Sequence, residues 1–204
     1  MSAPETWRRR VADVAELVVW VSTLRPATLG GRRLICVDGG AGAGKSTLGD
    51  AVVTAAAKVG TARLVHTDDL LDGWAGLARL GPTLDEGLLA PLATGRPGAY
   101  RRYDWLQERY VETLTVDPVD TLVLEGVGSW SPGYAHAVTT LVWVDAPRDL
   151  RLQRGLERDG EEMQQRWLTW LDDEAAHFLR AGTQEHADVL VDGTGASDQT
   201  VVLS

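Results

Sequence analysis

The chain has 204 residues, of which 44% are hydrophobic, and a formal net charge of -9. This length fits one domain, and the hydrophobic fraction is sufficient for a core on both sides of a sheet. The negative charge argues against nucleic acid or an anionic membrane as a partner, because phosphate-rich surfaces attract positive protein faces.

The N-terminal segment predicts an amphipathic helix over residues 4–22. Its apolar side chains recur at three-and-four spacing, at Val11, Val14, Ala15, Val18 and Val21. The longest apolar run, residues 17–21, is too short to cross a bilayer, and Asp13 and Glu16 interrupt the stretch that a signal peptide would need. With a single cysteine, Cys36, no disulfide can form within the chain. We therefore expect a cytoplasmic protein with no membrane partner.

A glycine-rich segment directly after the predicted strand 33–38 is the most specific feature of the sequence. Residues 39–47 match the pattern G-x-x-x-x-G-K-[ST], with Lys45 and Ser46 at its end. Glycines let backbone N–H groups converge on phosphate oxygens, the next helix adds its N-terminal dipole, and the lysine supplies a cation. The predicted nucleotide-binding residues are Gly39, Gly40, Ala41, Gly42, Ala43, Gly44, Lys45, Ser46 and Thr47. The alternative is a purely structural turn between strand and helix.

Two adjacent carboxylates follow the second predicted strand. A helix is expected to about residue 59, and the strand 62–66 then ends in Thr67, Asp68 and Asp69. Ligands of parallel α/β sheets bind at the carboxyl ends of strands. One of these two acids could accept a proton from an acceptor hydroxyl while the other holds Mg²⁺ through water. A turn or a helix cap is the alternative role for both.

Residues 70–118 are expected to form an insertion over the site. Residues 70–93 favour helix in pieces, and a turn follows at 95–98. Residues 100–105 and 110–116 fit either two paired strands or a helix, and the sequence does not decide between them. Within the insertion, the side chains expected to form a pocket for a polar ring or sugar are Arg101, Arg102, Tyr103, Asp104 and Trp105. Trp74 and Trp130 could contribute stacking.

Two further buried strands each end in an acid. The strand 121–125 ends in Glu125, and the strand 139–145 ends in Asp145. A carboxylate is costly to bury unless it binds a partner such as a metal. We favour Glu125 as the magnesium-associated acid, because Asp145 is placed to begin the following helix.

That helix, expected from Pro147 to about residue 158, carries four arginines. They recur at three-and-four spacing, at Arg148, Arg151, Arg154 and Arg158. Such a face could clamp a transferring phosphate from a lid spanning about 148–160. The alternative is a solvated helix flank paired with nearby acids.

The C-terminal part predicts one more helix, residues 161–180, and a last short strand, residues 188–191. Strands near residues 35, 64, 123, 142 and 190 alternate with helices. This order predicts a single α/β domain over 1–204, with a five-stranded parallel sheet and helices on both faces. The four histidines show no metal-binding spacing and are interpreted as structural: His66, His136, His177 and His186.

Four segments together resemble the uridine kinase-like branch of the P-loop nucleoside and small-molecule kinases. They are residues 37–47, 66–69, 122–126, and 142–145 with the arginine-bearing helix behind them. The resemblance implies a P-loop NTPase fold, a catalytic base that maps best onto Asp68, and a lid formed by the arginines. The chain departs from the family at Leu70 and Leu71, where an aromatic pair is usual, and at Gln153, Arg154 and Gly155, where adjacent arginines are frequent.

The sequence therefore predicts an ATP- and Mg²⁺-dependent phosphotransferase that acts on a hydroxyl of a small metabolite, with a nucleoside favoured. The alternatives are a nucleotide or sugar-acid kinase and, in another class, a nucleotide-dependent switch or regulatory ATPase. The predicted catalytic residues are Asp68, Lys45 and Arg154, and the lid residues are Arg151, Arg154 and Arg158. The predicted acceptor-binding residues are Asp69, Arg102, Tyr103, Asp104 and Glu125, and the metal-associated residues are Ser46, Asp68 and Glu125. We expect a monomer or a homodimer.

Overall fold

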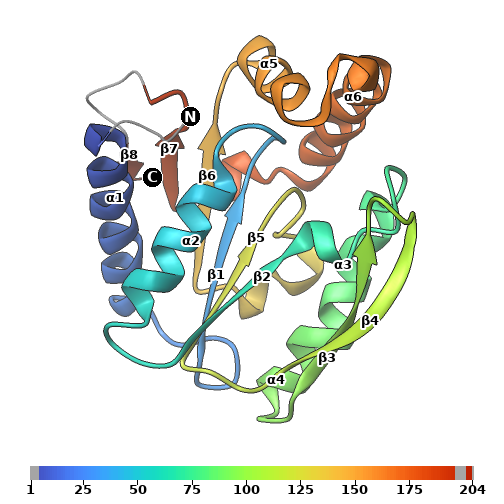
Figure 1. Ribbon diagram of the computed structural model, residues 1–204. Helices are drawn as coiled ribbons and strands as arrows, with labels where there is room; N and C mark the ends of the chain where they lie inside the picture. The colour runs from blue at the N-terminus through green and yellow to red at the C-terminus, as the bar shows by residue number, and fades with distance from the viewer. Residues whose placement is uncertain (1–4, 196–200, 204) are drawn as a thin grey trace.

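A mostly parallel sheet lies at the centre of the chain (Figure 1). The computed structural model describes residues 5–195 and 201–203. The strand order is β2-β5-β1-β6-β7-β8. The strands are β1 (Arg33–Asp38), β2 (Ala62–His66), β5 (Thr121–Glu125), β6 (Thr140–Asp145), β7 (Val189–Asp192) and β8 (Val201–Leu203). The first five pair in parallel, as predicted. Strand β8, which the sequence did not predict, adds to β7 in antiparallel orientation.

The central strands β1, β5 and β6 are buried along almost their whole length. Their sequences are nearly continuous apolar runs, which is typical of parallel strands covered on both faces. Polar side chains occur mainly where these strands end. The glycine-rich loop, Glu125 and Asp68 therefore meet at one edge of the sheet, because parallel strands point their carboxyl ends the same way.

Two helices cover one face of the sheet, α1 (Glu5–Thr23) and α2 (Lys45–Ala56) (Figure 1). The apolar stripe of α1, including Val14 and Val18, packs with Ile35 and Val37 of β1 in one buried cluster. The predicted N-terminal helix is confirmed within the described part of the chain, while residue 4, where the prediction began, lies outside it.

A broken helix packs on the opposite face. It consists of α3 (Leu77–Leu84), the wider turn η2 (Asp85–Leu89) and α4 (Ala90–Ala93). Pro82 and Pro91 lack an N–H donor, so they interrupt the regular hydrogen-bond ladder. The prediction of helix in pieces over residues 70–93 is confirmed for residues 77–93, whereas residues 70–76 are not helical.

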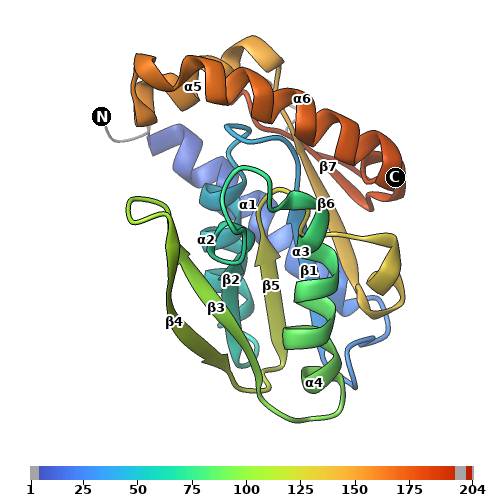
Figure 2. The same cartoon turned by 90° about the vertical axis from the view of Figure 1, so that its right-hand side faces the viewer.

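The undecided segments pair as an antiparallel hairpin, β3 (Gly98–Asp104) and β4 (Arg109–Val116) (Figure 2). In β3, buried and exposed residues alternate from Gly98 to Arg101, which is the period of a strand with one covered face. The hairpin contacts the turn η1 (Thr67–Asp69), where the Trp105 indole Nε1–H donates to the carbonyl of Asp68 over 3.1 Å. The hairpin therefore borders the acids that follow β2.

Helices α5 (Arg148–Asp159) and α6 (Gln164–Ala181) lie above the carboxyl ends of the strands (Figures 1 and 2). Short 3-10 turns complete the chain: η3 (Pro132–Ala137), η4 (Glu161–Met163) and η5 (Gln184–His186). Within the described part of the chain, no helix has the length and apolar character needed to cross a membrane.

Candidate functional site

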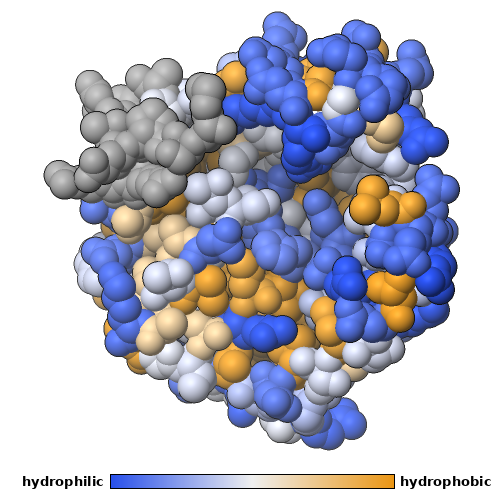
Figure 3. All heavy atoms as spheres, in the orientation of Figure 1, coloured by the Kyte–Doolittle hydropathy of each residue, from blue (hydrophilic) through white to orange (hydrophobic). Residues whose placement is uncertain are grey.

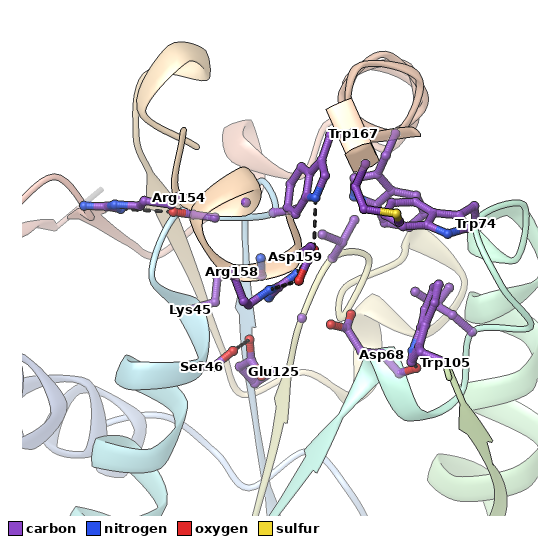
Figure 4. Close-up of a pocket in the computed structure, with 18 of the residues that line it drawn as sticks. Lys45, Ser46, Asp68, Trp74, Trp105, Glu125, Arg154, Arg158, Asp159 and Trp167 are labelled. Atoms are coloured by element: carbon purple, nitrogen blue, oxygen red, sulfur yellow. Dashed lines mark hydrogen bonds and ion pairs between the residues drawn. The ribbon is translucent and has the colours of Figure 1, made fainter. Parts of the chain in front are cut away.

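A cavity of about 1250 Å³ opens at the carboxyl edge of the sheet, beneath α5 and α6. Figure 3 shows the surface hollowed there, below the hydrophilic side chains of the two helices. The glycine-rich loop and Thr194 line one end, and aromatic side chains of the hairpin and of α6 line the other. Asp68 lies between the two ends (Figure 4). The cavity thus has a cationic, glycine-lined end and an aromatic end.

The loop between β1 and α2 has the form of an anion cradle. Helix α2 begins at Lys45, and no side chain caps its N-terminus. Its first N–H groups therefore have no intrahelical acceptor, which is the usual setting for a bound phosphate. Gly42 has a φ of 80°, and a Cβ there would lie 2.6 Å from the carbonyl oxygen of Arg151. Lys45 is 6% exposed, and its Nζ donates to the carbonyl of Gly40 over 3.0 Å.

Ser46, Glu125 and His66 form a chain of side-chain hydrogen bonds. The Ser46 hydroxyl donates to Glu125 Oε1 over 3.1 Å, and Glu125 Oε2 lies 2.7 Å from His66 Nδ1. These contacts arise because Glu125 at the end of β5 is paired in register with His66 at the end of β2. The hydrogen bond to Glu125 raises the pKa of His66. His66, interpreted from the sequence as structural, therefore contacts the acid predicted to associate with magnesium, whereas Asp145 does not line the cavity.

Both predicted acids after β2 line the cavity. Asp68 is exposed to water through the cavity. Desolvation by the protein atoms around its carboxyl group raises the pKa of Asp68, and the Lys45 ammonium opposes the shift. Desolvation likewise raises the pKa of Asp69, while His66, Arg102 and a hydrogen bond with Tyr100 act against it. A carboxylate with a raised pKa is a stronger base, which suits proton abstraction.

Aromatic side chains form the wall beyond Asp68. Trp74 is the centre of this aromatic wall, and its ring meets Trp105, Trp167 and Trp170 edge to face, with centroids 5.6, 6.4 and 5.8 Å apart. Tyr103 adds a further edge contact on Trp105 at 5.4 Å. Trp74, which the sequence suggested for stacking, is thus in the cavity.

Three side chains suggested for the acceptor site lie elsewhere. Arg102 pairs with Glu112 across the hairpin over 2.7 Å. Asp104 accepts hydrogen bonds from backbone N–H groups of the hairpin turn, including that of Gln107. Trp130 is buried and stacks on His186 at 4.9 Å. None of the three lines the cavity, because Arg102 and Asp104 serve the hairpin and Trp130 serves the core.

The four arginines of α5 do not act as one face over the cavity. Arg148 pairs with Asp172 on α6, and Arg151 pairs with Glu174 beneath the loop. The Arg154 guanidinium donates to the carbonyls of Gly42 and Gly193, and it points away from Asp68 (Figure 4). Arg158, held by Asp159, is close enough to Asp68 to oppose the rise that desolvation causes in the pKa of that acid. Arg154 and Arg158 line the cavity, whereas Arg151 does not. The expected lid is thus corrected at Arg151, because Glu174 holds this arginine beneath the loop.

No protein-family model and no curated protein matches the chain. Solved structures do match it. One is a possible uridine kinase from Bacillus stearothermophilus, with a TM-score of 0.66 and 19% identity over 90% of this chain and 98% of that one. Another, described as a candidate fructose transport system kinase from Silicibacter sp. TM1040, has a TM-score of 0.60 and 17% identity over 84% and 94% of the two chains. The chain therefore shares the α/β fold of these two structures, both described as kinases.

The packing within this fold explains why a glycine follows Arg154. Gly155 is buried, and a Cβ at this position would lie 2.5 Å from the indole of Trp167. The aromatic wall therefore occupies the space that a second adjacent arginine would need. Packing against Trp167 thus accounts for the glycine at residue 155, while the other neighbour of Arg154 is Gln153.

Two buried acids that contact the P-loop were missed by the sequence analysis. Glu174 of α6 accepts from the Ala41 N–H over 2.8 Å. Asp38 at the end of β1 accepts from the N–H groups of Gly39, Gly128 and Trp130 over 2.8 to 3.0 Å. Asp38 could have been suspected, because a charged residue ended an otherwise apolar strand. Glu174 gave no such signal among the other acids of its helix.

The buried carboxyl group of Asp38 is expected to make the stability of the chain depend on pH. Burial raises its pKa from 3.8 to about 7 against the opposing effect of its N–H donors and Lys45. The folded chain therefore binds this proton more tightly than the unfolded chain, so the free energy of unfolding falls as pH rises from about 4 to about 7, by on the order of 4 kcal/mol. Urea unfolding across this range should show a shallower decline for Asp38→Asn than for the wild type. Parallel curves for the two proteins would contradict the assignment.

Proposed function

We propose that the chain is an ATP-dependent kinase that transfers the γ-phosphate to a hydroxyl of a small molecule, with a nucleoside as the first candidate. The observation that carries the proposal is a single cavity shared by the P-loop, Lys45, Asp68 and the aromatic wall. Its volume exceeds that of an ordinary single-ligand pocket, which is about 300 to 1,000 Å³. A triphosphate and an acceptor can therefore be accommodated on opposite sides of Asp68.

The P-loop, Lys45, Asp68 and Arg158 each have a role in this reaction. The P-loop amides and Lys45 would hold the phosphates, and Asp68 would take the proton of the acceptor hydroxyl as its oxygen bonds to the γ-phosphorus. The bond between that phosphorus and the β,γ-bridging oxygen breaks, and ADP leaves with the electron pair. Arg158, on the lid side, would balance charge on the transferring group.

Ser46 and Glu125 are suited to magnesium when the nucleotide is present. Among the residues that the structure describes, no three His, Cys, Asp or Glu side chains gather into a metal site of their own. This fits a metal held partly by substrate phosphates, as Mg²⁺ commonly is. When bound, the ion would neutralise phosphate charge, and Ser46 and Glu125 would supply its oxygen donors from the protein side.

The charge of the cavity lining beyond the P-loop favours an acceptor without a phosphate or carboxylate of its own. Arg158 pairs with Asp159, and Arg166 lies 3.8 Å from Glu108. Asp69 adds another acid to the cavity lining. An anionic acceptor would meet these carboxylates, and like-charge contacts cost several kcal/mol. A nucleotide or sugar-acid kinase is therefore less well supported than a kinase of neutral hydroxyl compounds.

A panel of acceptors tests the proposal. The full chain is incubated with Mg-ATP and nucleosides, sugars or small alcohols, and in parallel with nucleoside monophosphates and sugar acids. ADP formation and the mass of the acceptor are measured. We expect acceptor-dependent ADP release with neutral compounds, at least about tenfold faster than with their anionic counterparts. Intact ATP binding with no acceptor-stimulated turnover would defeat the kinase proposal and favour a regulatory ATPase.

A further inference from the structure

A buried ion pair between Glu174 and Arg151 binds the backbone of the P-loop at Ala41. Glu174 is 1% exposed on α6, and its Oε2 accepts from the Ala41 N–H over 2.8 Å, 133 residues away in sequence. Its other carboxylate oxygen pairs with the Arg151 guanidinium of α5. Arg151 in turn donates to the carbonyl oxygens of Ala41 over 3.3 Å and of Ala146 over 3.0 Å. Both polar groups of the Ala41 backbone are thus held by one Glu174–Arg151 pair.

The loop fits closely against this pair. A Cβ at Gly40 would collide with the Arg151 guanidinium, and one at Gly42 would lie 2.6 Å from the Arg151 carbonyl oxygen. The loop residues before Lys45 are therefore positioned by α5 and α6 as well as by the sheet. Changes in the pair should alter where the loop amides point.

The charges of the pair are matched to an anion-binding loop. A lone carboxylate beside the P-loop would repel a triphosphate and compete for Lys45, whose charge already acts on Glu174. The Arg151 guanidinium compensates for it. Removing one partner of a buried pair leaves an uncompensated charge, which is far more costly than removing both.

We propose that Glu174 and Arg151 are positioning residues that set the P-loop for triphosphate binding. Glu174 shares one face of α6 with Trp167 and Trp170, which line the aromatic end of the cavity. The same helix therefore supports both ends of the site. The proposal rests on the nucleotide-binding part of the proposed function and does not depend on phosphate transfer.

Binding measurements on four variants test the proposal. Isothermal titration calorimetry measures the affinity of the full chain for Mg-ATP and for tripolyphosphate, a probe of the loop alone. In Glu174→Gln, the side-chain NH₂ faces either the Ala41 N–H or the Arg151 guanidinium, which are both donors, so one hydrogen bond is lost. We expect about tenfold weaker binding of Mg-ATP and of tripolyphosphate. Arg151→Met leaves the carboxylate uncompensated, and we expect on the order of 100-fold weaker binding. The Glu174→Gln/Arg151→Met double variant has no carboxylate to repel the triphosphate, so its affinity should recover to within about tenfold of the wild type.

The matched control is Asp172→Asn. Asp172 pairs with Arg148 over 2.8 Å between the same two helices, but at an exposed position, so this variant should bind both ligands within about twofold of the wild type. Circular dichroism and thermal unfolding confirm that each variant is folded.

Three results would overturn the proposal: wild-type or tighter binding by Glu174→Gln, equal losses of affinity in Glu174→Gln and Asp172→Asn, or binding by the Glu174→Gln/Arg151→Met double variant as weak as that of Arg151→Met. If Arg151→Met does not fold, the comparison of Glu174→Gln with Asp172→Asn decides alone. A wild-type chain that binds Mg-ATP without transferring phosphate defeats only the kinase proposal.

Discussion

Asp68→Asn is expected to lower kcat by about 10³-fold, within the range for removal of a general base, while the affinity for Mg-ATP stays within a few fold. The asparagine keeps the shape of the side chain but cannot take a proton. Asp68 faces the cavity between Lys45 and the aromatic wall (Figure 4). The hydrogen bond from Trp105 goes to the main-chain carbonyl of Asp68, so the substitution leaves the hairpin contact in place.

Asp69→Asn provides the comparison that separates the two adjacent acids. Asp69 also lines the cavity, but it is hydrogen bonded to Tyr100. We expect its substitution to raise the acceptor KM more than it lowers kcat, because it removes a contact that is the same in ground and transition states. Steady-state kinetics with the best acceptor measure both variants. Unimpaired turnover in Asp68→Asn together with a large kcat loss in Asp69→Asn would reverse the assignment of the base.

The sequence was sufficient for the elements that a local pattern determines. Residues 39–47 lead from strand β1 into helix α2 as the motif predicts, and the apolar runs before Asp68 and Glu125 form strands whose ends meet at one edge of the sheet. The five parallel strands follow from the same runs. These features depend on residues close in sequence, so periodicity and motif spacing find them.

The features that the sequence did not predict depend on contacts between residues that are far apart along the chain. Arg151 has the helical spacing of a lid residue, yet Glu174 holds it beneath the loop, and only the packing of α5 on α6 determines this. Residues 100–116 fit helix or strand by composition, and pairing between Gly98 and Val116 decides. The Gly155 departure becomes clear only once Trp167 is seen to occupy the space beside it.

Lys45→Met is expected to abolish detectable transfer, with a loss in kcat/KM of about 10³-fold or more, and to weaken Mg-ATP binding as well. Methionine keeps much of the length and apolar contact of lysine but removes the ammonium group. Lys45 is almost fully buried at the cationic end of the cavity, and its charge acts on Asp38, Asp68 and Glu174. Its removal therefore leaves three carboxylates around the phosphate site without this compensation.

The matched control is Lys58→Met, just beyond α2. Lys58 forms an exposed ion pair with Glu16 over 2.8 Å, and exposed pairs contribute about 0 to 1 kcal/mol. Its substitution should leave both turnover and nucleotide affinity unchanged.

Calorimetry then distinguishes the two catalytic variants, because Asp68→Asn should retain Mg-ATP binding and Lys45→Met should lose most of it. Equal Mg-ATP affinity in Lys45→Met and Lys58→Met would mean that the Lys45 ammonium does not hold the phosphates, and the assignment of this loop as the nucleotide site would fail.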